Sequence, residues 1–303
     1  MQKIIDQNAP QKAAPVQLHP KMHPTQACGT IAQTCLAQLA ANAAGVLASD
    51  DPEFIHQARV ALRRLRSALR LFRPHLDAAF YARFDPELRW LAGLLGHARD
   101  WDVLASQTVP RILNPAGAQR AGAAERALAQ AIAPRREQCR GAVRKALRSR
   151  RYRQLMRTGE AEFSALEQLA PDHTRLRDFA AARLKRAAKK LHIKPRALHA
   201  MDAEKRHRVR IHAKRLRYAI DFFASLYKYK RVRRYEAPLG RLQDALGRLN
   251  DEAVALSLFA ALPVTESALR ALHAGLQAGT EDCLAEAEKA LRKLADAEPF
   301  WTG

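Results

Sequence analysis

The sequence predicts an all-α protein made of two related halves, and three observations lead to this prediction. Apolar residues recur with a helical period, and no segment of convincing length alternates apolar and polar residues as a strand does. Alanine, leucine and arginine abound while aromatic residues make up only 6% of the chain, which favours helices. The third observation is an internal repeat, in which two motifs recur at one constant spacing.

The repeat pairs a cationic motif with a motif of leucine and glycine. Segments Ile55–Arg66 and Arg206–Arg217 share the pattern His-x2-Arg-x3-[Arg/Lys]-Arg-Leu-Arg, and their aligned histidines are 151 residues apart. The same spacing carries Leu88–Asp100, which reads Leu-x2-Leu-x3-Leu-Gly-x3-Asp, onto Leu239–Asp251. Two motifs that keep one offset without a gap indicate a duplicated structural unit.

The first half should open with a tail and two helices. Residues 1–24 hold four prolines without helical periodicity, so a flexible tail or linker is expected there, followed by a helix over about 25–48. Asp51-Pro52-Glu53 then supplies an N-cap, a proline at the first helical position and an early acid, so a basic helix starts there. This helix should end at Arg73, because Pro74 disfavours helical geometry in the residue before it.

The remainder of the first half is expected to be helical with two interruptions. One helical stretch should end at Gly96, and another should begin near Asp100, where acidic residues suit a helix N-terminus. Residues 114–124 are predicted to form a connection, and long arginine-rich helices should follow over about 125–168.

The second half, which begins after Pro171-Asp172, should repeat this order. It opens with a helix whose apolar side runs over 176–191, and Lys194-Pro195 interrupts the helical pattern before the repeated basic helix at about 202–228. The segment over 238–252 should then reproduce the turn of the first half, and helices are expected to continue to about 297.

These elements predict one domain over 25–298, with helical repeats at 25–170 and 171–298. Each repeat is long enough for an antiparallel four-helix bundle. A twofold pseudo-symmetry between the repeats would bring the two basic helices together around a central positive groove or pore.

Each basic helix should carry a row of cations, because positions separated alternately by three and four residues share one side of a helix. In the first copy this row extends over roughly 25 Å and comprises His56, Arg59, Arg63, Arg66, Arg70 and Arg73. An apolar stripe runs beside it and marks the core side, comprising Ile55, Ala58, Leu62, Leu65, Leu69 and Phe72. The row of the second copy comprises His207, Arg210, Lys214 and Arg217.

The basic row of the first copy lacks internal neutralisation. From Phe54 to Phe72 there is no Asp or Glu, so guanidinium groups one helical turn apart repel each other without relief from the same helix. An ordinary solvent-exposed helix face usually mixes charges of both signs. We therefore favour an anionic partner over a passive surface.

Composition limits the class of protein. Lys and Arg number 52 against 30 acidic residues, giving a net charge of +22, and this balance favours polyanions such as nucleic acid, anionic lipid or polyphosphate. The four cysteines form no CxxC pair, and Cys28 and Cys35 are expected to pack in the core, which suits a reducing compartment. No secretory signal is evident, and no apolar run approaches the roughly 20 residues needed to span a bilayer. A cytoplasmic protein without a membrane partner is expected.

Motifs for cofactors and metals are absent from the sequence. There is no Gly-x4-Gly-Lys-[Ser/Thr] loop or Gly-x-Gly-x2-Gly fingerprint, and the only His-x3-His pair, His19 and His23, lies in the proline-rich tail. We expect no cofactor, no metal and no enzymatic activity. Asp100 and Asp251 should give structural support, either by orienting an arginine of the row or by capping a helix. The alternative, a metal site for phosphate hydrolysis or transfer, is less favoured.

These residues resemble the CHAD family, an α-helical domain named for its histidines. Its signature is the repeated His-x2-Arg-x3-[Lys/Arg]-Arg-Leu-Arg helix followed by Leu-Gly-x2-Arg-Asp-x-Asp, and the resemblance spans about 25–298. The first copy is full, whereas the second has Asn250 and Ala253 where the first has Arg99 and Asp102. The second acid of the signature is therefore not essential in this chain.

The resemblance implies a module of two packed four-helix bundles that binds inorganic polyphosphate, often in association with polyphosphate granules. It implies binding residues at His56, Arg59, Arg63, Arg64, Arg66, His207, Arg210, Lys214, Arg215 and Arg217. Arg70 continues the first row, and Arg183 and Lys190, on a third basic strip, are further candidates. The histidines could contact phosphate directly or form a hydrogen bond near the bundle interface, and both roles stay open.

Other partners are kept as alternatives. Many CHAD proteins carry an N-terminal triphosphate-tunnel (CYTH) domain, and the segment 14–20 resembles the linker that follows it, so the chain could be a fragment or an independent form. Nucleic acid is permitted by the charge, but the basic helices offer few exposed aromatics for stacking on bases. A third hypothesis is a basic scaffold that docks on an acidic protein or a granule coat.

Overall fold

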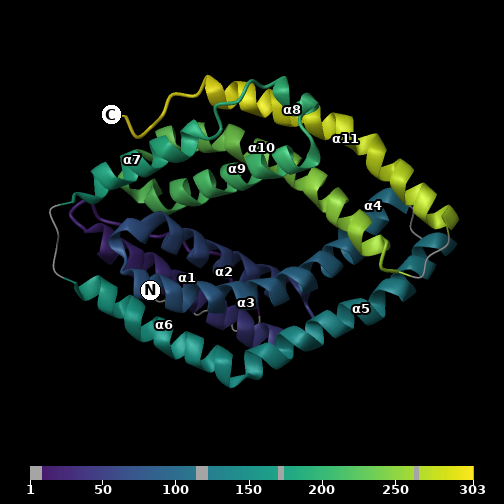
Figure 1. Cartoon of the computed structure of the whole chain (residues 1–303), viewed down its shortest axis with the longest axis horizontal. Coiled ribbons are helices and arrows are strands. Elements are labelled where there is room, and N and C mark those ends of the chain that lie inside the picture. The colour runs from purple at the N-terminus through teal and green to yellow at the C-terminus, as the bar shows by residue number, and fades with distance from the viewer. Residues whose placement is uncertain (1–8, 114–121, 170–173, 263–265, 303) are drawn as a thin grey trace. The chain divides into compact units, whose positions relative to one another are not determined.

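The described part of the chain is helical and contains no strand, which confirms the all-α prediction. The computed structural model describes residues 9–113, 122–169, 174–262 and 266–302, without the side chains at 113, 123–124 and 266–278. The helices appear in Figure 1 as α1 (Pro24–Ala48), α2 (Pro52–Phe72), α3 (Ala78–Val103), α4 (Val109–Leu113), α5 (Ala123–Arg148), α6 (Arg150–Gln168), α7 (Leu176–Lys189), α8 (Ala197–Ala200), α9 (Ala203–Phe223), α10 (Tyr229–Phe259) and α11 (Glu266–Ala295).

The chain divides into two compact units that interleave along the sequence. Unit 1 comprises 1–99, 141–185 and 218–228, and unit 2 comprises 100–140, 186–217 and 229–303. Helices α3, α5, α7 and α9 each continue from one unit into the other. Each unit therefore contains segments from both halves of the sequence. The duplication of the chain into repeats at 25–170 and 171–298 stays a prediction from the sequence.

Unit 1 is built around α1, which packs against both α2 and α6. Glycines allow the close approach: a Cβ added at Gly45 would lie 2.1 Å from the ring of Phe54, and one at Gly29 would lie 2.7 Å from the Phe163 carbonyl oxygen. Aromatic rings connect α3 to α6, with the centroids of Phe84 and Phe163 4.8 Å apart. Small residues thus let large rings fill the core of this unit.

Helix α2 has the predicted boundaries and the predicted core face. The side chain of Asp51 accepts a hydrogen bond of 2.8 Å from the backbone N–H of Glu53, and Pro52 is the first helical residue. The helix ends at Phe72, where a 3-10 turn follows. All six residues of the predicted apolar stripe are buried: Ile55, Ala58, Leu62, Leu65, Leu69 and Phe72.

The described end of the proline-rich segment lies on unit 1 without forming a helix. Val16 and Leu18 are buried, the backbone N–H of Gln11 donates to Asn42, and that of Leu18 donates to the hydroxyl of Ser225 at 2.9 Å. These contacts hold residues 9–22 against the unit, although the irregular backbone itself was expected.

By length and composition alone, α1 is long and apolar enough to cross a membrane, so the expectation that no such segment exists is wrong for this helix. Its most apolar window has a mean hydropathy of 1.3, and 56% of that window is buried inside the protein. A core helix passes the same test, and α1 packs against α2 and α6 in this unit.

In unit 2, α10 packs against α11. A buried cluster joins the end of α3 and the following π-helical turn to α5 and α10, comprising Trp101, Leu104, Val109, Leu128, Ile132, Ala255, Phe259 and Leu262. A second aromatic group holds residues 300 and 301 on α10, where Tyr235 contacts Phe300 and Trp301 with centroid distances of 5.9 and 4.8 Å.

The predicted helix breaks after Gly96 and after Leu246 are wrong, because α3 and α10 continue through both positions. Gly96 instead makes room for an arginine: a Cβ there would lie 2.9 Å from Nη1 of Arg59. Asp102 is fully buried and accepts hydrogen bonds from Arg136 at 2.6 Å and Arg140 at 3.3 Å, so it pairs with α5 rather than opening a helix. Most of the predicted connection 114–124, and the Pro171-Asp172 midpoint, lie outside the described residues.

Candidate functional site

The basic row of α2 lies at the edge of the core in unit 1. His56, Arg59, Arg63 and Arg66 are half-buried, whereas Arg70 is exposed. Helix α3 borders the row, with Gly96 against Arg59. The row thus lies beside packed helices and remains partly exposed to solvent.

Two arginines of this row have buried donors without acceptors. Among the residues that the structure describes, no hydrogen-bond partner reaches Nε of Arg63 or Nε of Arg66. The Arg63 guanidinium lies 5.6 Å from the centroid of the Tyr218 ring, a cation–π contact that fixes it from the side of α9. Burial lowers the pKa of Arg66, while the Asp85 carboxylate opposes that shift. An anionic acceptor arriving here would satisfy donors that otherwise remain unpaired.

Arg64 differs from its neighbours in the motif because it belongs to the core. Its side chain is 6% exposed, forms an ion pair with Asp221, and lies 5.4 Å from the centroid of the Phe222 ring. Burial raises the pKa of the adjacent Cys35 thiol to about 11, against the opposing effect of the Arg64 charge. This arginine connects α2 to the C-terminal end of α9, so its position favours support of the fold over contact with a ligand.

His56 opens the row in a setting that disfavours its charged form. Burial is the largest cause that lowers its pKa below the ordinary value of 6.5, and the Arg99 guanidinium adds to the effect. The carboxylate of Glu53 acts in the opposite direction, and the charges of Arg63 and Arg59 lower the pKa further. The imidazole is therefore mainly neutral at pH 7.

The basic row of α9 begins in unit 2 with a histidine held by α10. Nδ1 of His207 lies 3.1 Å from Oδ1 of Asn250, which stands where the first copy of the motif has Arg99. Further along, Arg217 donates to Oε1 of Gln243 at 3.1 Å, and the amide of Gln243 donates to the Ala213 carbonyl at 2.7 Å. Two amide side chains of α10 thus orient this row. Arg210 and Lys214 are half-buried, and Arg215 and Arg217 are exposed.

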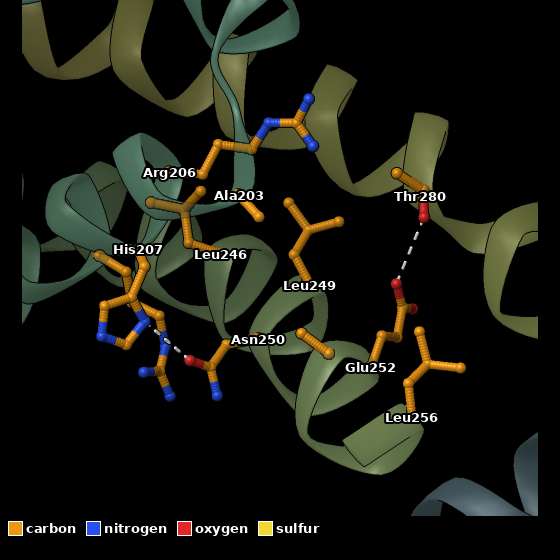
Figure 2. A pocket seen from close by; sticks show the side chains of 11 residues that line it. Ala203, Arg206, His207, Leu246, Leu249, Asn250, Glu252, Leu256 and Thr280 are labelled. Atoms are coloured by element: carbon orange, nitrogen blue, oxygen red, sulfur yellow. Dashed lines mark hydrogen bonds between the residues drawn. The ribbon is translucent and has the colours of Figure 1, made fainter. Parts of the chain in front are cut away.

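A pocket of about 360 Å³ opens beside the start of this row (Figure 2). It is lined by Ala203, Arg206, His207, Arg210, Leu246, Leu249, Asn250, Glu252, Ala253, Leu256 and Thr280. The sequence did not single out Arg206, which donates to the backbone carbonyl oxygens of Leu198 at 3.1 Å and His199 at 3.3 Å. The first copy has an isoleucine in its place, so the repeat pattern gave no signal for it.

Glu252 closes one side of the pocket. It is buried and accepts hydrogen bonds of 3.4 Å from Arg111 and from the hydroxyl of Thr280. Burial raises the pKa of this carboxyl group, and the Arg111 charge opposes the shift. The repeat-equivalent position in the first copy is Trp101, which is also buried, so this carboxylate is particular to the second copy.

Asp100 and Asp251 lie at the same small pocket in unit 2. Its lining contains three pairs of repeat-equivalent positions, Asp100 with Asp251, Val103 with Val254, and Leu104 with Ala255, together with Thr108. Both aspartates lie inside continuous helices, so the capping role considered for them is wrong. Their position is consistent with structural support, which stays a prediction.

The third basic strip is divided between the units. Arg183 lies in unit 1 with its guanidinium 5.1 Å from the centroid of the Phe179 ring. Lys190 is exposed in unit 2, where its charge, after burial, helps to lower the pKa of His212. His212 was not anticipated from the sequence, and no partner reaches its buried Nδ1 within the described residues.

Within residues 9–113, 122–169, 174–262 and 266–302, no group of three or more His, Cys, Asp or Glu side chains is arranged to hold a metal ion. The four cysteines are free, and Cys28, Cys35 and Cys283 are buried.

These features define an all-α protein in which a repeated helical motif presents rows of arginine, lysine and histidine. A family model described as the CHAD domain matches residues 30–260, and the chain belongs to the CHAD family. The chain is similar to the crystal structure of the CHAD domain from the plant Ricinus communis, at 31% identity and a TM-score of 0.78, with 94% of this chain and 96% of that chain covered. PptA from Streptomyces chartreusis is similar in fold, at 19% identity and a TM-score of 0.61, with 91% and 98% covered. No curated protein sequence matches the chain.

Proposed function

We propose that this protein binds inorganic polyphosphate through the basic rows of α2 and α9 and does not alter it chemically. The contacts assigned to the polymer come from His56, Arg59, Arg63, Arg66 and Arg70 of α2 and from His207, Arg210, Lys214, Arg215 and Arg217 of α9. Arg64 is left out because its side chain is buried in the core and its Nη1 pairs with Asp221, although its Nε and Nη2 donors also lack partners among the described residues. The groove or pore expected from the sequence stays a prediction.

The observation that carries the proposal is the state of Arg63 and Arg66. Their Nε donors are buried and unpartnered in the described structure, on a helix that has no acid between Phe54 and Phe72. Leaving a buried donor unpaired costs roughly 1–3 kcal/mol, more when the group is charged. A phosphate chain supplies acceptors and negative charge together, and therefore offsets both costs. Membership of the CHAD family supports the same ligand class.

The chemistry of arginine suits a linear phosphate polymer. Its planar guanidinium keeps its charge at physiological pH and donates two parallel hydrogen bonds to phosphate oxygens, whereas Lys214 acts as a point charge. Residues one helical turn apart can contact successive parts of the phosphate polymer. Affinity should therefore increase with chain length and decrease steeply with salt, as condensed ions are released.

The proposal includes a place in the cell. A basic, non-enzymatic polyphosphate binder is expected in the cytoplasm, at polyphosphate granules, without a membrane partner, cofactor or metal. The rival hypotheses, nucleic-acid binding and docking on an acidic protein or a fused CYTH domain, predict other ligands for the same rows.

Competition separates these ligands. Long-chain polyphosphate should displace labelled duplex DNA from the full chain at equal phosphate concentration, and neutralising Arg63 and Arg66 together (R63Q/R66Q) should weaken polyphosphate binding by about tenfold or more, given the strength of charge-assisted hydrogen bonds. The matched control is K289Q/K293Q, which removes the same charge from exposed positions on α11. Preferential retention of DNA, or equal weakening by both variants, would reject the proposal.

A further inference from the structure

A second basic surface lies on α6, outside the repeated motifs. The stretch from Gly141 to Gly159 contains seven Lys and Arg residues and no acid. Lys145 and Arg148 occupy the last turn of α5, where the helix dipole favours cations. The first turns of α6 are different, because they hold arginines at a helix N-terminus, where the dipole favours acids.

One of these arginines has a structural partner. Arg151 forms two hydrogen bonds to the carboxylate of Glu87, at 2.6 and 3.1 Å, and its guanidinium lies 4.2 Å from the centroid of the Trp90 ring. This arginine therefore joins α6 to α3. Its charge is neutralised within unit 1.

The remaining three, Arg150, Arg153 and Arg157, form what we call the α6 patch. All three are exposed, and no carboxylate in the described part of the chain forms an ion pair with them. Arg153 uses one donor on the Arg148 carbonyl, at 2.6 Å, and the next acid along the helix, Glu160, follows three residues after Arg157 without an ion pair to the patch in the described structure. Their spacing of three and four residues places them on one side of α6, along about 10 Å.

The α6 patch points away from the helices on which α6 packs. The buried face of α6 comprises Tyr152, Leu155, Gly159, Phe163 and Leu166. This face meets α1, where a Cβ at Gly159 would lie 3.0 Å from Leu36, and α3, where Arg83 pairs with Glu162 at 2.8 Å. The row of α2 lies on a different helix that also packs on α1. A polymer on one surface therefore leaves the other accessible.

We infer that the α6 patch binds a second chain of inorganic polyphosphate, so that one protein molecule links two polymers. This inference rests on the proposed function. The patch offers charge and hydrogen-bond donors but, with Tyr152 buried, no exposed aromatic ring within 141–159 on which a base could stack, which favours an inorganic phosphate chain over single-stranded nucleic acid. Linking two polymers would let the protein hold phosphate chains together rather than only coat them.

A sandwich assay tests the inference with the full chain. Protein is captured at low density on beads that carry biotinylated long-chain polyphosphate, the beads are washed, and fluorescently labelled polyphosphate is added. The wild type should retain labelled polymer. The variant R150Q/R153Q/R157Q should lose at least about 90% of that retention while the amount of protein on the beads stays within about twofold, because the α2 row still holds the first chain.

The control is R241Q/K289Q/K293Q, which removes three exposed charges from α10 and α11 and should retain labelled polymer as the wild type does. Neutralising the α6 patch should also reduce the slope of log affinity against log salt for the labelled chain by about 2. Equal retention by the patch variant, or a wild type that binds the beads but captures no second chain, would overturn the inference. Failure of the wild type to bind the beads would instead reject the proposed function. If labelled single-stranded DNA is retained in preference to labelled polyphosphate, the ligand class is wrong.

Discussion

Phe72 and Phe223, which occupy equivalent positions 151 residues apart, meet edge to face in unit 1 with ring centroids 5.8 Å apart. Phe179 completes the cluster, stacked on Phe72 at 5.1 Å. In unit 2, the equivalent positions Asp100 and Asp251 both line one small pocket. The contact between Phe72 and Phe223 is compatible with the duplication expected from the sequence, which stays a prediction.

The first prediction concerns the phenylalanine cluster. Phe72→Ala should lower the free energy of unfolding by about 3–5 kcal/mol, because it removes a fully buried ring between two others. Chemical denaturation measures this loss. Tyr229→Ala, at a position 75% exposed, is the control and should change stability little. A loss below about 1 kcal/mol for Phe72→Ala would show that the cluster does not hold unit 1 together.

Arg64 should affect stability rather than binding. Arg64→Ala removes the partner of Asp221, whose side chain remains 36% exposed, so the expected loss is about 1–3 kcal/mol after allowing for solvent screening. The double variant R64A/D221A should recover part of that loss. Polyphosphate affinity of the folded variant, measured by calorimetry, should stay within about threefold of the wild type. A tenfold weaker affinity with unchanged stability would show that Arg64 contacts the ligand.

Gly96 and Gly93 provide a matched pair on α3. A Cβ at Gly96 would meet Nη1 of Arg59 at 2.9 Å, whereas one at Gly93 would meet nothing within 4 Å. Both substitutions to alanine improve helix propensity by up to about 1 kcal/mol. Gly96→Ala should displace the Arg59 guanidinium and weaken polyphosphate binding by up to about tenfold, while Gly93→Ala leaves binding unchanged. If the two variants bind equally, Arg59 does not contact the ligand.

Polyphosphate binding should take up protons. Burial and then Arg99 hold the pKa of His56 below 6.5, and a phosphate chain beside it adds negative charge that raises the pKa. Affinity should therefore rise as pH falls toward and below 6.5. Calorimetry near pH 6 in buffers of different ionisation heat measures the uptake, which His56→Gln should reduce. Unchanged uptake in that variant would place His56 outside the site.

Without ligand, protonation of His56 opposes folding, whereas it favours polyphosphate binding. Its folded-state pKa lies below that of the unfolded chain, so the unfolded state binds more protons in this range. Stability should fall as pH decreases through about 6.5, and His56→Gln should flatten that dependence. A stability profile that is equally steep in the variant would assign the effect to other groups.

The sequence was sufficient for the helices whose signals are local. The cap and proline before α2 placed its start, and the periodic apolar stripe identified its buried face. Glycine was misleading in α3, because the reason for Gly96 is the approach of Arg59 from another helix rather than a chain break. Whether a glycine ends a helix or makes room for another helix depends on residues that are distant in the sequence.

The site was harder to predict than the fold. Arg63 and Arg64 are adjacent in the motif, but only the packing of α9 shows that Arg64 meets Asp221, 157 residues away in the sequence, and that Arg63 lies over Tyr218. Arg206 and Glu252 have no counterpart in the first copy, so the repeat pattern could not indicate them. Residue type predicts an anionic ligand, whereas only burial in the structure separates Arg64 from the half-buried Arg63 and Arg66.

Arg63 and Arg66, whose Nε donors lack partners among the described residues, are the proposed contacts of the α2 row for linear polyphosphate. The most direct measurement is the affinity for long-chain polyphosphate across a salt series, compared between the wild type, R63Q/R66Q and K289Q/K293Q. We predict a steep decrease with salt for the wild type and the control, and a slope smaller by about 1–2 in R63Q/R66Q, since each lost phosphate contact releases fewer ions. An identical slope and affinity in R63Q/R66Q and the wild type would contradict the account.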